Sequence, residues 1–126
     1  MDMRTPLGKV RGLGSAKSGT DHFWKVRTTS VALVPLLLFY IVFLIAYVGR
    51  PYAEVVGALA NPFVATINAL TVIASIAHMR LGMEEIIQDY VHSEGMKVLF
   101  LVLNAFFSLV IGGLCLIAVL KIAFAG

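Results

Sequence analysis

Long apolar runs alternate with short polar segments along this chain. Apolar positions dominate residues 28–48, 62–83 and 98–124. At 1.5 Å per residue, a helix of about 20 residues crosses the roughly 30 Å hydrocarbon core of a bilayer. The pattern therefore predicts an all-α membrane protein with three transmembrane helices.

Breaking and capping residues set the boundaries of these spans. Arg27 marks the start of the first span, and the Gly-Arg-Pro run at 49–51 ends it. Asn61 is a favourable N-cap and Pro62 suits the first helical position, so the second helix begins there and continues amphipathically to about Tyr90. The Ser-Glu-Gly run at 93–95 is expected to break it. The predicted spans are about 28–48, 62–90 and 98–124, in one domain (27–126) that follows a flexible basic arm (1–26).

Composition and charge support insertion in a membrane. The 126 residues are 60% hydrophobic and 13% charged, whereas globular chains average about 25% charged residues. Basic residues beside a span orient it in the membrane, so we favour this role over nucleic-acid binding. The N-terminus should face the cytoplasm or matrix, with the 49–61 loop and the C-terminus outside. Basic residues gather before the first span, at Arg4, Lys9, Arg11, Lys17, Lys25 and Arg27.

Polar and small residues follow a narrow stripe along the second span. At 100° per residue they share one side of the helix, while the other faces are mostly aliphatic or Met. The stripe therefore faces protein or a cofactor rather than lipid. A second stripe in the third span predicts a face pressed against another helix. The first stripe is Thr71, Ser75, His78, Gly82, Glu85 and Asp89; the second is Asn104, Ser108, Gly112 and Cys115.

His78 is the most informative residue of the first stripe. It lies about five residues inside the end of the apolar run, where an ionisable group is costly unless it is paired or liganded. Gly82, one turn away, leaves room for a flat macrocycle or another backbone. The pair fits an axial heme ligand beside a cleared surface. The alternative is a histidine that only hydrogen-bonds a neighbouring helix.

Other polar residues flank the predicted inner membrane surface. A phenol such as Tyr90 can donate a hydrogen bond to a quinone carbonyl, and the Asp89 carboxylate can relay protons from water. Simpler roles are an aromatic-belt anchor and a solvated carboxylate. Arg27 and His22 could neutralise heme propionates, or Arg27 could only anchor the first span.

The segment 78–83, followed by Asp89 and Tyr90, resembles the His-x3-Gly-x6-Asp-Tyr signature of the smaller cytochrome b membrane anchor of succinate dehydrogenase, respiratory complex II. Residues 22–28 also resemble the entry of that family into its first span. The resemblance implies that His78 is an axial ligand of heme b, that Tyr90 and Asp89 belong to the ubiquinone site, and that Arg27, with His22 nearby, meets a heme propionate.

The resemblance also implies partners and a location. A larger cytochrome b anchor subunit would supply the second heme ligand, and an iron–sulfur subunit and a flavoprotein subunit would dock on the inner side. This chain has no cysteine cluster and no dinucleotide fingerprint, so it carries no succinate site. A bacterial inner membrane is favoured over a mitochondrial one. Alternatives are the anchor of a quinol:fumarate reductase and a cofactor-free scaffold or transporter subunit.

Overall fold

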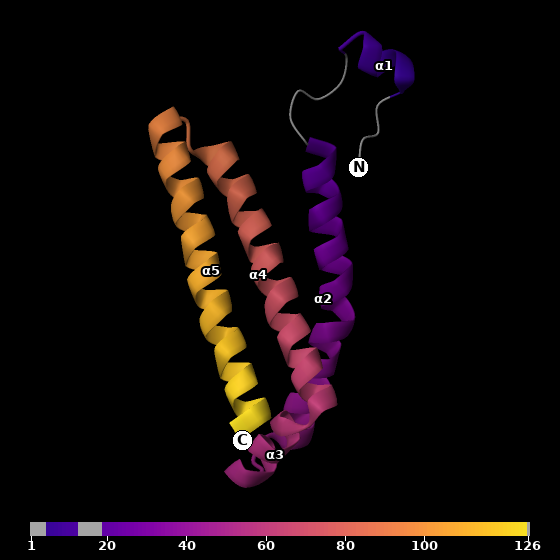
Figure 1. The fold of residues 1–126 in the computed structure, drawn as a ribbon, viewed down its shortest axis with the longest axis vertical. Coiled ribbons are helices and arrows are strands. Elements are labelled where there is room, and N and C mark those ends of the chain that lie inside the picture. Colours follow the sequence, from indigo (N-terminus) through magenta and orange to yellow (C-terminus); the bar gives the residue numbers. More distant parts are fainter. Residues whose placement is uncertain (1–4, 13–18, 126) are drawn as a thin grey trace.

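The computed structural model describes residues 5–12 and 19–125. The helices are α1 (Pro6–Val10), α2 (Gly19–Tyr47), α3 (Tyr52–Ala60), α4 (Pro62–Tyr90) and α5 (Glu94–Ala125). Helix α4 packs against α5 on one side and α2 on the other (Figure 1). Among the described residues, three helices are long and apolar enough to cross a membrane, over Thr20–Tyr47, Pro62–Tyr90 and Glu94–Phe124. The predicted all-α class with three spans is confirmed.

Helix α2 begins earlier than the apolar pattern alone indicates. It starts at Gly19, so residues 19–26, predicted as part of the flexible arm, continue the helix of the first span. An ion pair of 3.0 Å between Lys25 Nζ and Asp21 Oδ2, one turn apart, supports this polar extension. The helix ends before Gly49, whose φ of 78° lies in the left-handed region that favours glycine. Two residues of the basic arm, Arg4 and Lys17, lie outside the described residues.

The ends of α4 combine a confirmed prediction with a corrected one. Asn61 Oδ1 accepts hydrogen bonds from the backbone N–H groups of Phe63 (2.9 Å) and Val64 (3.5 Å), so it caps α4 as predicted. The break between α4 and α5 spans residues 91–93 rather than 93–95. The Ser93 carbonyl already accepts a helical hydrogen bond from Lys97 N (2.8 Å), which places Gly95 in the first turn of α5.

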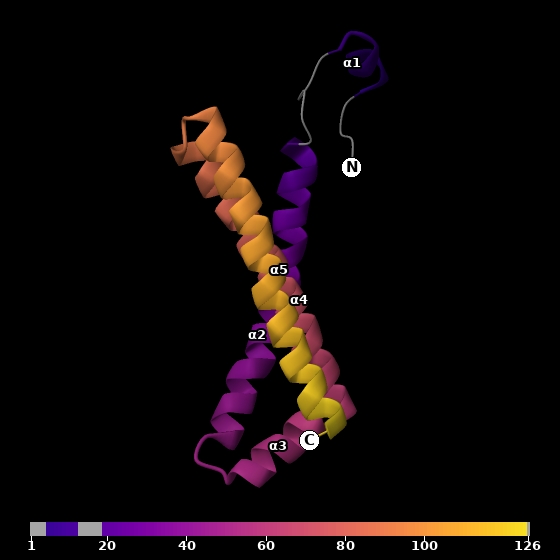
Figure 2. The same cartoon turned by 60° about the vertical axis from the view of Figure 1, so that its left-hand side comes forward.

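The 49–61 loop contains a helix that the apolar pattern did not predict. Helix α3 is short, and its half-buried side contacts α4 and α5 at the end of the bundle where the C-terminus also lies (Figure 2). At nine residues it is too short to give a span signal. It closes this end of the bundle by packing against the helix termini.

The interior of the bundle is polar and its surface is apolar. The buried side chains include only one large hydrophobic residue, Ile87, whereas large aliphatic and aromatic side chains cover the outside in the described part of the chain. Lipid tails are as apolar as leucine, so helices in a membrane associate through small and polar residues instead of hydrophobic burial. The buried polar residues are Asn68, Thr71, Asn104 and Ser108.

The contact between α4 and α5 shows this packing in detail. Asn104 Nδ2 donates a hydrogen bond of 3.1 Å to the carbonyl oxygen of Arg80. A Cβ atom at Gly112 would lie 3.3 Å from two side-chain carbons of Ile76, so the absence of a side chain allows the close approach. The predicted packing face of the third span is confirmed at Asn104, Ser108 and Gly112, but Cys115 is exposed.

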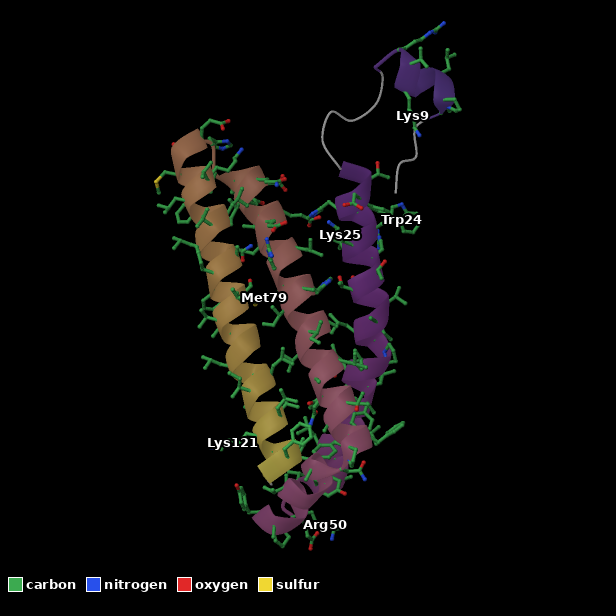
Figure 3. All side chains as sticks on the ribbon, in the orientation of Figure 1. Lys9, Trp24, Lys25, Arg50, Met79 and Lys121 are labelled. Atoms are coloured by element: carbon green, nitrogen blue, oxygen red, sulfur yellow. The ribbon has the colours of Figure 1, made fainter. Side chains whose placement is uncertain are left out.

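Charged and interfacial side chains mark the two ends of the bundle. Trp24 and Lys25 lie at the end where α2 begins, and Arg50 and Lys121 lie toward the opposite end, near α3 (Figure 3). The connection between α4 and α5 lies at the same end as the start of α2, and the C-terminus lies at the other (Figure 1). This arrangement is that of a chain that crosses a bilayer three times in alternating directions.

Candidate functional site

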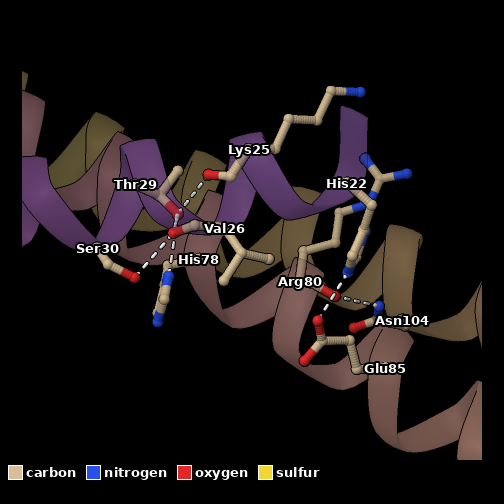
Figure 4. A network of polar contacts seen from close by, with 9 residues as sticks. All are labelled: His22, Lys25, Val26, Thr29, Ser30, His78, Arg80, Glu85 and Asn104. Carbon is tan, nitrogen blue, oxygen red and sulfur yellow. Dashed lines mark hydrogen bonds and ion pairs between the residues drawn. The ribbon is translucent and has the colours of Figure 1, made fainter. Parts of the chain in front are cut away.

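His78 lies on the side of α4 that faces α2. Its ring is half-buried, and Nδ1 lies 3.0 Å from Thr29 Oγ1 on α2 (Figure 4). The other ring nitrogen, Nε2, makes no hydrogen bond to any residue that the structure describes. One side of the imidazole is therefore held by the protein, and the other is free to bind a ligand or a metal.

Thr29 is itself anchored to the backbone of α2. Its hydroxyl lies 2.9 Å from the carbonyl oxygen of Lys25 and 3.0 Å from that of Val26. Such contacts to the preceding turn are common for threonine inside a helix and hold the side chain in one rotamer. The Thr29 hydroxyl that contacts His78 is therefore restrained in its position.

Gly82 leaves open space one turn beyond His78. A Cβ atom built at this position would lie more than 4 Å from every heavy atom of the described residues outside its own stretch of helix. Ser75, one turn to the other side, carries a small side chain that is only half-buried. This part of α4 is therefore bordered by small residues, which a flat group beside His78 requires.

A second polar contact joins α2 and α4 closer to the end of the bundle. His22 Nε2 lies 3.1 Å from Glu85 Oε1, with side-chain exposures of 29% and 53% (Figure 4). Both His78 and Glu85 belong to the polar stripe predicted on the second span. In this structure the stripe meets α2 at these two positions.

Arg27 and His22 do not converge on His78. Arg27 is exposed, and its guanidinium carbon lies 5.1 Å from the centre of the Phe23 ring, a cation–π contact. His22 is engaged by Glu85. No hydrogen bond or ion pair joins Arg27 to another described residue, so its N–H donors remain available for a carboxylate.

Asp89 and Tyr90 lie at the exposed end of α4. Tyr90 is 77% exposed, and no hydrogen bond or ion pair joins either side chain to another described residue. They stand about three turns, roughly 18 Å along the helix, from His78. The chain thus separates the candidate heme position from the candidate quinone position.

A cavity of about 540 Å³, with charged side chains on its rim, opens between α2 and α4 on the side of Thr29. Two ion pairs border the cavity, each within one helix: Arg80 Nε lies 3.2 Å from Glu84 Oε1 on α4, and Lys25 pairs with Asp21 on α2. The basic and acidic side chains beside the cavity are therefore balanced, and they lie where the apolar middle of the bundle gives way to its polar end. The lining residues are Asp21, Trp24, Lys25, Thr28, Thr29, Ala77, Arg80, Leu81 and Glu84.

The chain by itself supplies a single metal ligand at His78. Within residues 5–12 and 19–125, no three His, Cys, Asp or Glu side chains gather as a metal site. The donor set nevertheless fits a heme shared with another chain, because one ring nitrogen of His78 is free, the other is bonded, and small residues flank the ring.

The comparisons with known proteins agree with one another. A family model described as succinate dehydrogenase/fumarate reductase transmembrane subunit matches residues 1–112. A succinate dehydrogenase hydrophobic membrane anchor subunit from Paracoccus denitrificans is 34% identical over 86 residues, which is 68% of this chain and 67% of that protein. The subunit of the same name from Rickettsia bellii is 29% identical over 108 residues, or 86% of each chain. A succinate dehydrogenase membrane anchor subunit from Reclinomonas americana is 32% identical over 85 residues, covering 65% of this chain and 71% of that one. No solved structure matches the chain.

Proposed function

Because this chain belongs to the succinate dehydrogenase/fumarate reductase transmembrane subunit family, we propose that it supplies one axial ligand to heme b and part of a ubiquinone-reduction site. Its relatives and its three apolar helices make it a multi-pass membrane anchor of a succinate dehydrogenase. The larger cytochrome b anchor subunit supplies the second heme ligand. The iron–sulfur and flavoprotein subunits dock at the inner face of a bacterial inner membrane.

The observation that carries the proposal is the free Nε2 atom of His78. The imidazole lies within an apolar helix, is fixed through Nδ1 by Thr29, and has no described partner at Nε2. An ionisable ring inside a membrane span is costly unless it is paired or liganded. Heme b, when bound, supplies a one-electron redox centre. His78 binds its iron, and Gly82 leaves room for the macrocycle.

Arg27 is the proposed partner of a heme propionate. No hydrogen bond or ion pair to a described residue occupies its N–H donors, so the guanidinium can bind a carboxylate through two N–H groups. His22 has the weaker claim to the same role, because it already pairs with Glu85. A propionate would have to compete with that carboxylate.

Tyr90 and Asp89 are the proposed quinone residues. Quinone reduction takes up two protons along with two electrons, so the site must combine a hydrogen-bond donor with access to water. Tyr90 presents its hydroxyl at the exposed end of α4, and Asp89 precedes it there. The phenol binds a quinone carbonyl, and the carboxylate passes protons inward from the aqueous side.

The optical spectrum of the purified complex tests the heme proposal. We expect His78→Ala to lose or shift the heme b absorbance, because the iron loses an axial ligand. His92→Ala is the matched control, since His92 is exposed in the segment after α4, and its spectrum should match the native one. An unchanged heme b spectrum in His78→Ala would remove His78 as the ligand, whereas a native complex without heme b absorbance would favour a cofactor-free scaffold.

A fumarate reductase anchor is the related alternative, since the family description includes both enzymes. The three curated relatives described above are named as succinate dehydrogenase subunits, which favours succinate oxidation. The quinone that co-purifies with the complex discriminates the two. Ubiquinone supports the proposal, and a low-potential menaquinone supports the alternative.

A further inference from the structure

We propose that Thr29 is a positioning residue for His78. Its hydroxyl accepts a hydrogen bond from Nδ1–H and thereby holds the imidazole in the tautomer whose Nε2 lone pair is free for iron. This inference rests on the proposed role of His78 as a heme ligand. In that proposal α2 contributes no iron ligand, but its Thr29 fixes the tautomer of the ligand on α4.

The direction of the bond follows from counting protons. A threonine hydroxyl has one proton and two lone pairs. Thr29 Oγ1 lies 2.9 Å from the Lys25 carbonyl oxygen and 3.0 Å from the Val26 carbonyl oxygen, and carbonyl oxygens only accept. If the proton pointed at His78 instead, two oxygen–oxygen contacts at these distances would be left without a hydrogen. The hydroxyl proton therefore goes to the carbonyls, and the proton between Thr29 and His78 belongs to Nδ1.

The position of the hydroxyl matters as well as its chemistry. Ser30 Oγ donates a similar bond of 2.8 Å to the Val26 carbonyl oxygen, yet no bond joins it to His78 (Figure 4). Threonine is restricted at χ1, and here two backbone contacts fix it further. In an apolar environment an unpaired Nδ1–H would be costly, so the ring is held by this one acceptor.

The consequence for the iron is predictable. A ligand histidine that donates its second N–H becomes a more basic ligand, and loss of such a partner costs about 10–100-fold in metal affinity or activity. A more basic ligand favours ferric over ferrous iron. Removing the hydroxyl should therefore weaken heme retention and raise the heme reduction potential.

The experiment compares variants of the whole purified complex. Thr29→Val removes the hydroxyl at nearly constant shape, Thr29→Ala removes it with a smaller side chain, and Thr29→Ser keeps it. Ser30→Ala is the matched control, because it removes a neighbouring hydroxyl with the same backbone bond. The readouts are heme per flavin, retention of heme during washing, and the heme reduction potential. Thr29→Val and Thr29→Ala should lower heme retention by about tenfold at least and raise the heme reduction potential. Thr29→Ser and Ser30→Ala should behave like the native complex.

Each contrary outcome has a distinct meaning. Native heme retention and potential in Thr29→Val, with heme loss in His78→Ala, overturns the role of Thr29 while leaving the ligand in place. Equal shifts in Ser30→Ala would mean that α2 is perturbed generally, which also overturns it. The role of Thr29 is also overturned if Thr29→Val and Thr29→Ala both fail to assemble while Ser30→Ala assembles. The Thr29 hydroxyl would then serve to hold the helices together. A native spectrum in His78→Ala defeats the proposed function itself.

Discussion

Tyr90 is a residue whose proposed role depends on one atom, the phenolic hydroxyl at the exposed end of α4. We expect Tyr90→Phe to lower ubiquinone reduction about tenfold, the effect of losing one hydrogen bond of about 1–1.5 kcal/mol in the reaction. Succinate oxidation with an artificial acceptor should remain near the native rate, because the soluble subunits carry it. The two rates are measured on the same membranes.

Tyr52 provides the control for this substitution. It is 83% exposed, against 77% for Tyr90, and it begins α3 at the opposite end of the bundle. Tyr52→Phe should leave both rates unchanged. Equal loss of both rates in Tyr90→Phe would indicate failed assembly, and no loss in either would leave Tyr90 without a role at the quinone.

At the same scale, the sequence identified His78 but not its neighbour. The depth of a histidine inside an apolar run can be read from the chain alone, and so can the periodicity that puts Gly82 on the same side. The bond from Thr29 depends on how α2 is rotated about its axis relative to α4, which no local pattern encodes. His22 and Glu85 show the same limit, because their pairing joins residues 63 positions apart. The heme role of His78 stays a prediction, and so do the roles of His22, Arg27, Asp89 and Tyr90.

At the scale of elements, boundaries followed from capping chemistry more reliably than from hydropathy. Asn61 and Pro62 predicted the start of α4 because an N-cap acts within three residues. The predicted start of α2 was wrong, because hydropathy marks only the apolar part of a helix. The first turns of α2 are polar and carry an ion pair. The break lies at 91–93 because the Ser93 carbonyl already accepts a helical hydrogen bond from Lys97 in the first turn of α5. Helix α3 was missed because it is short.

The packing of α4 against α5 gives a prediction at this scale. Gly112 is buried, and its missing Cβ would already lie 3.3 Å from Ile76. Gly112→Val should therefore push the helices apart and destabilise the bundle by about 1–3 kcal/mol, the usual cost of overpacking. Gly113→Val is the matched control, since a Cβ there meets nothing within 4 Å among the described residues. A lower temperature of heme loss on heating, seen in Gly112→Val and not in Gly113→Val, is the expected result. Equal stability of the two variants would contradict this packing.

For the whole molecule, the main question is which end of the bundle faces the cytoplasm. The structure places the start of α2 and the connection between α4 and α5 at one end, and α3 and the C-terminus at the other (Figure 1). The basic residues Lys25, Arg27 and Lys97 belong to the first end, and Arg50 and Lys121 lie toward the second. Basic residues near the span ends favour the cytoplasmic side, so we propose that the first end faces inward. The soluble subunits would then bind beside Asp89 and Tyr90.

Cysteine accessibility tests this orientation, because the chain has a single cysteine, Cys115, that can be replaced by serine. In that background, Ala53→Cys at the exposed start of α3 should react with a membrane-impermeant maleimide in spheroplasts. Ser93→Cys, exposed between α4 and α5, should react only in inverted vesicles stripped of peripheral subunits. Labelling after detergent treatment controls for the intrinsic reactivity of each thiol. The reverse pattern would put α3 in the cytoplasm, and Tyr90 could then no longer lie beside subunits that deliver electrons from the inner side.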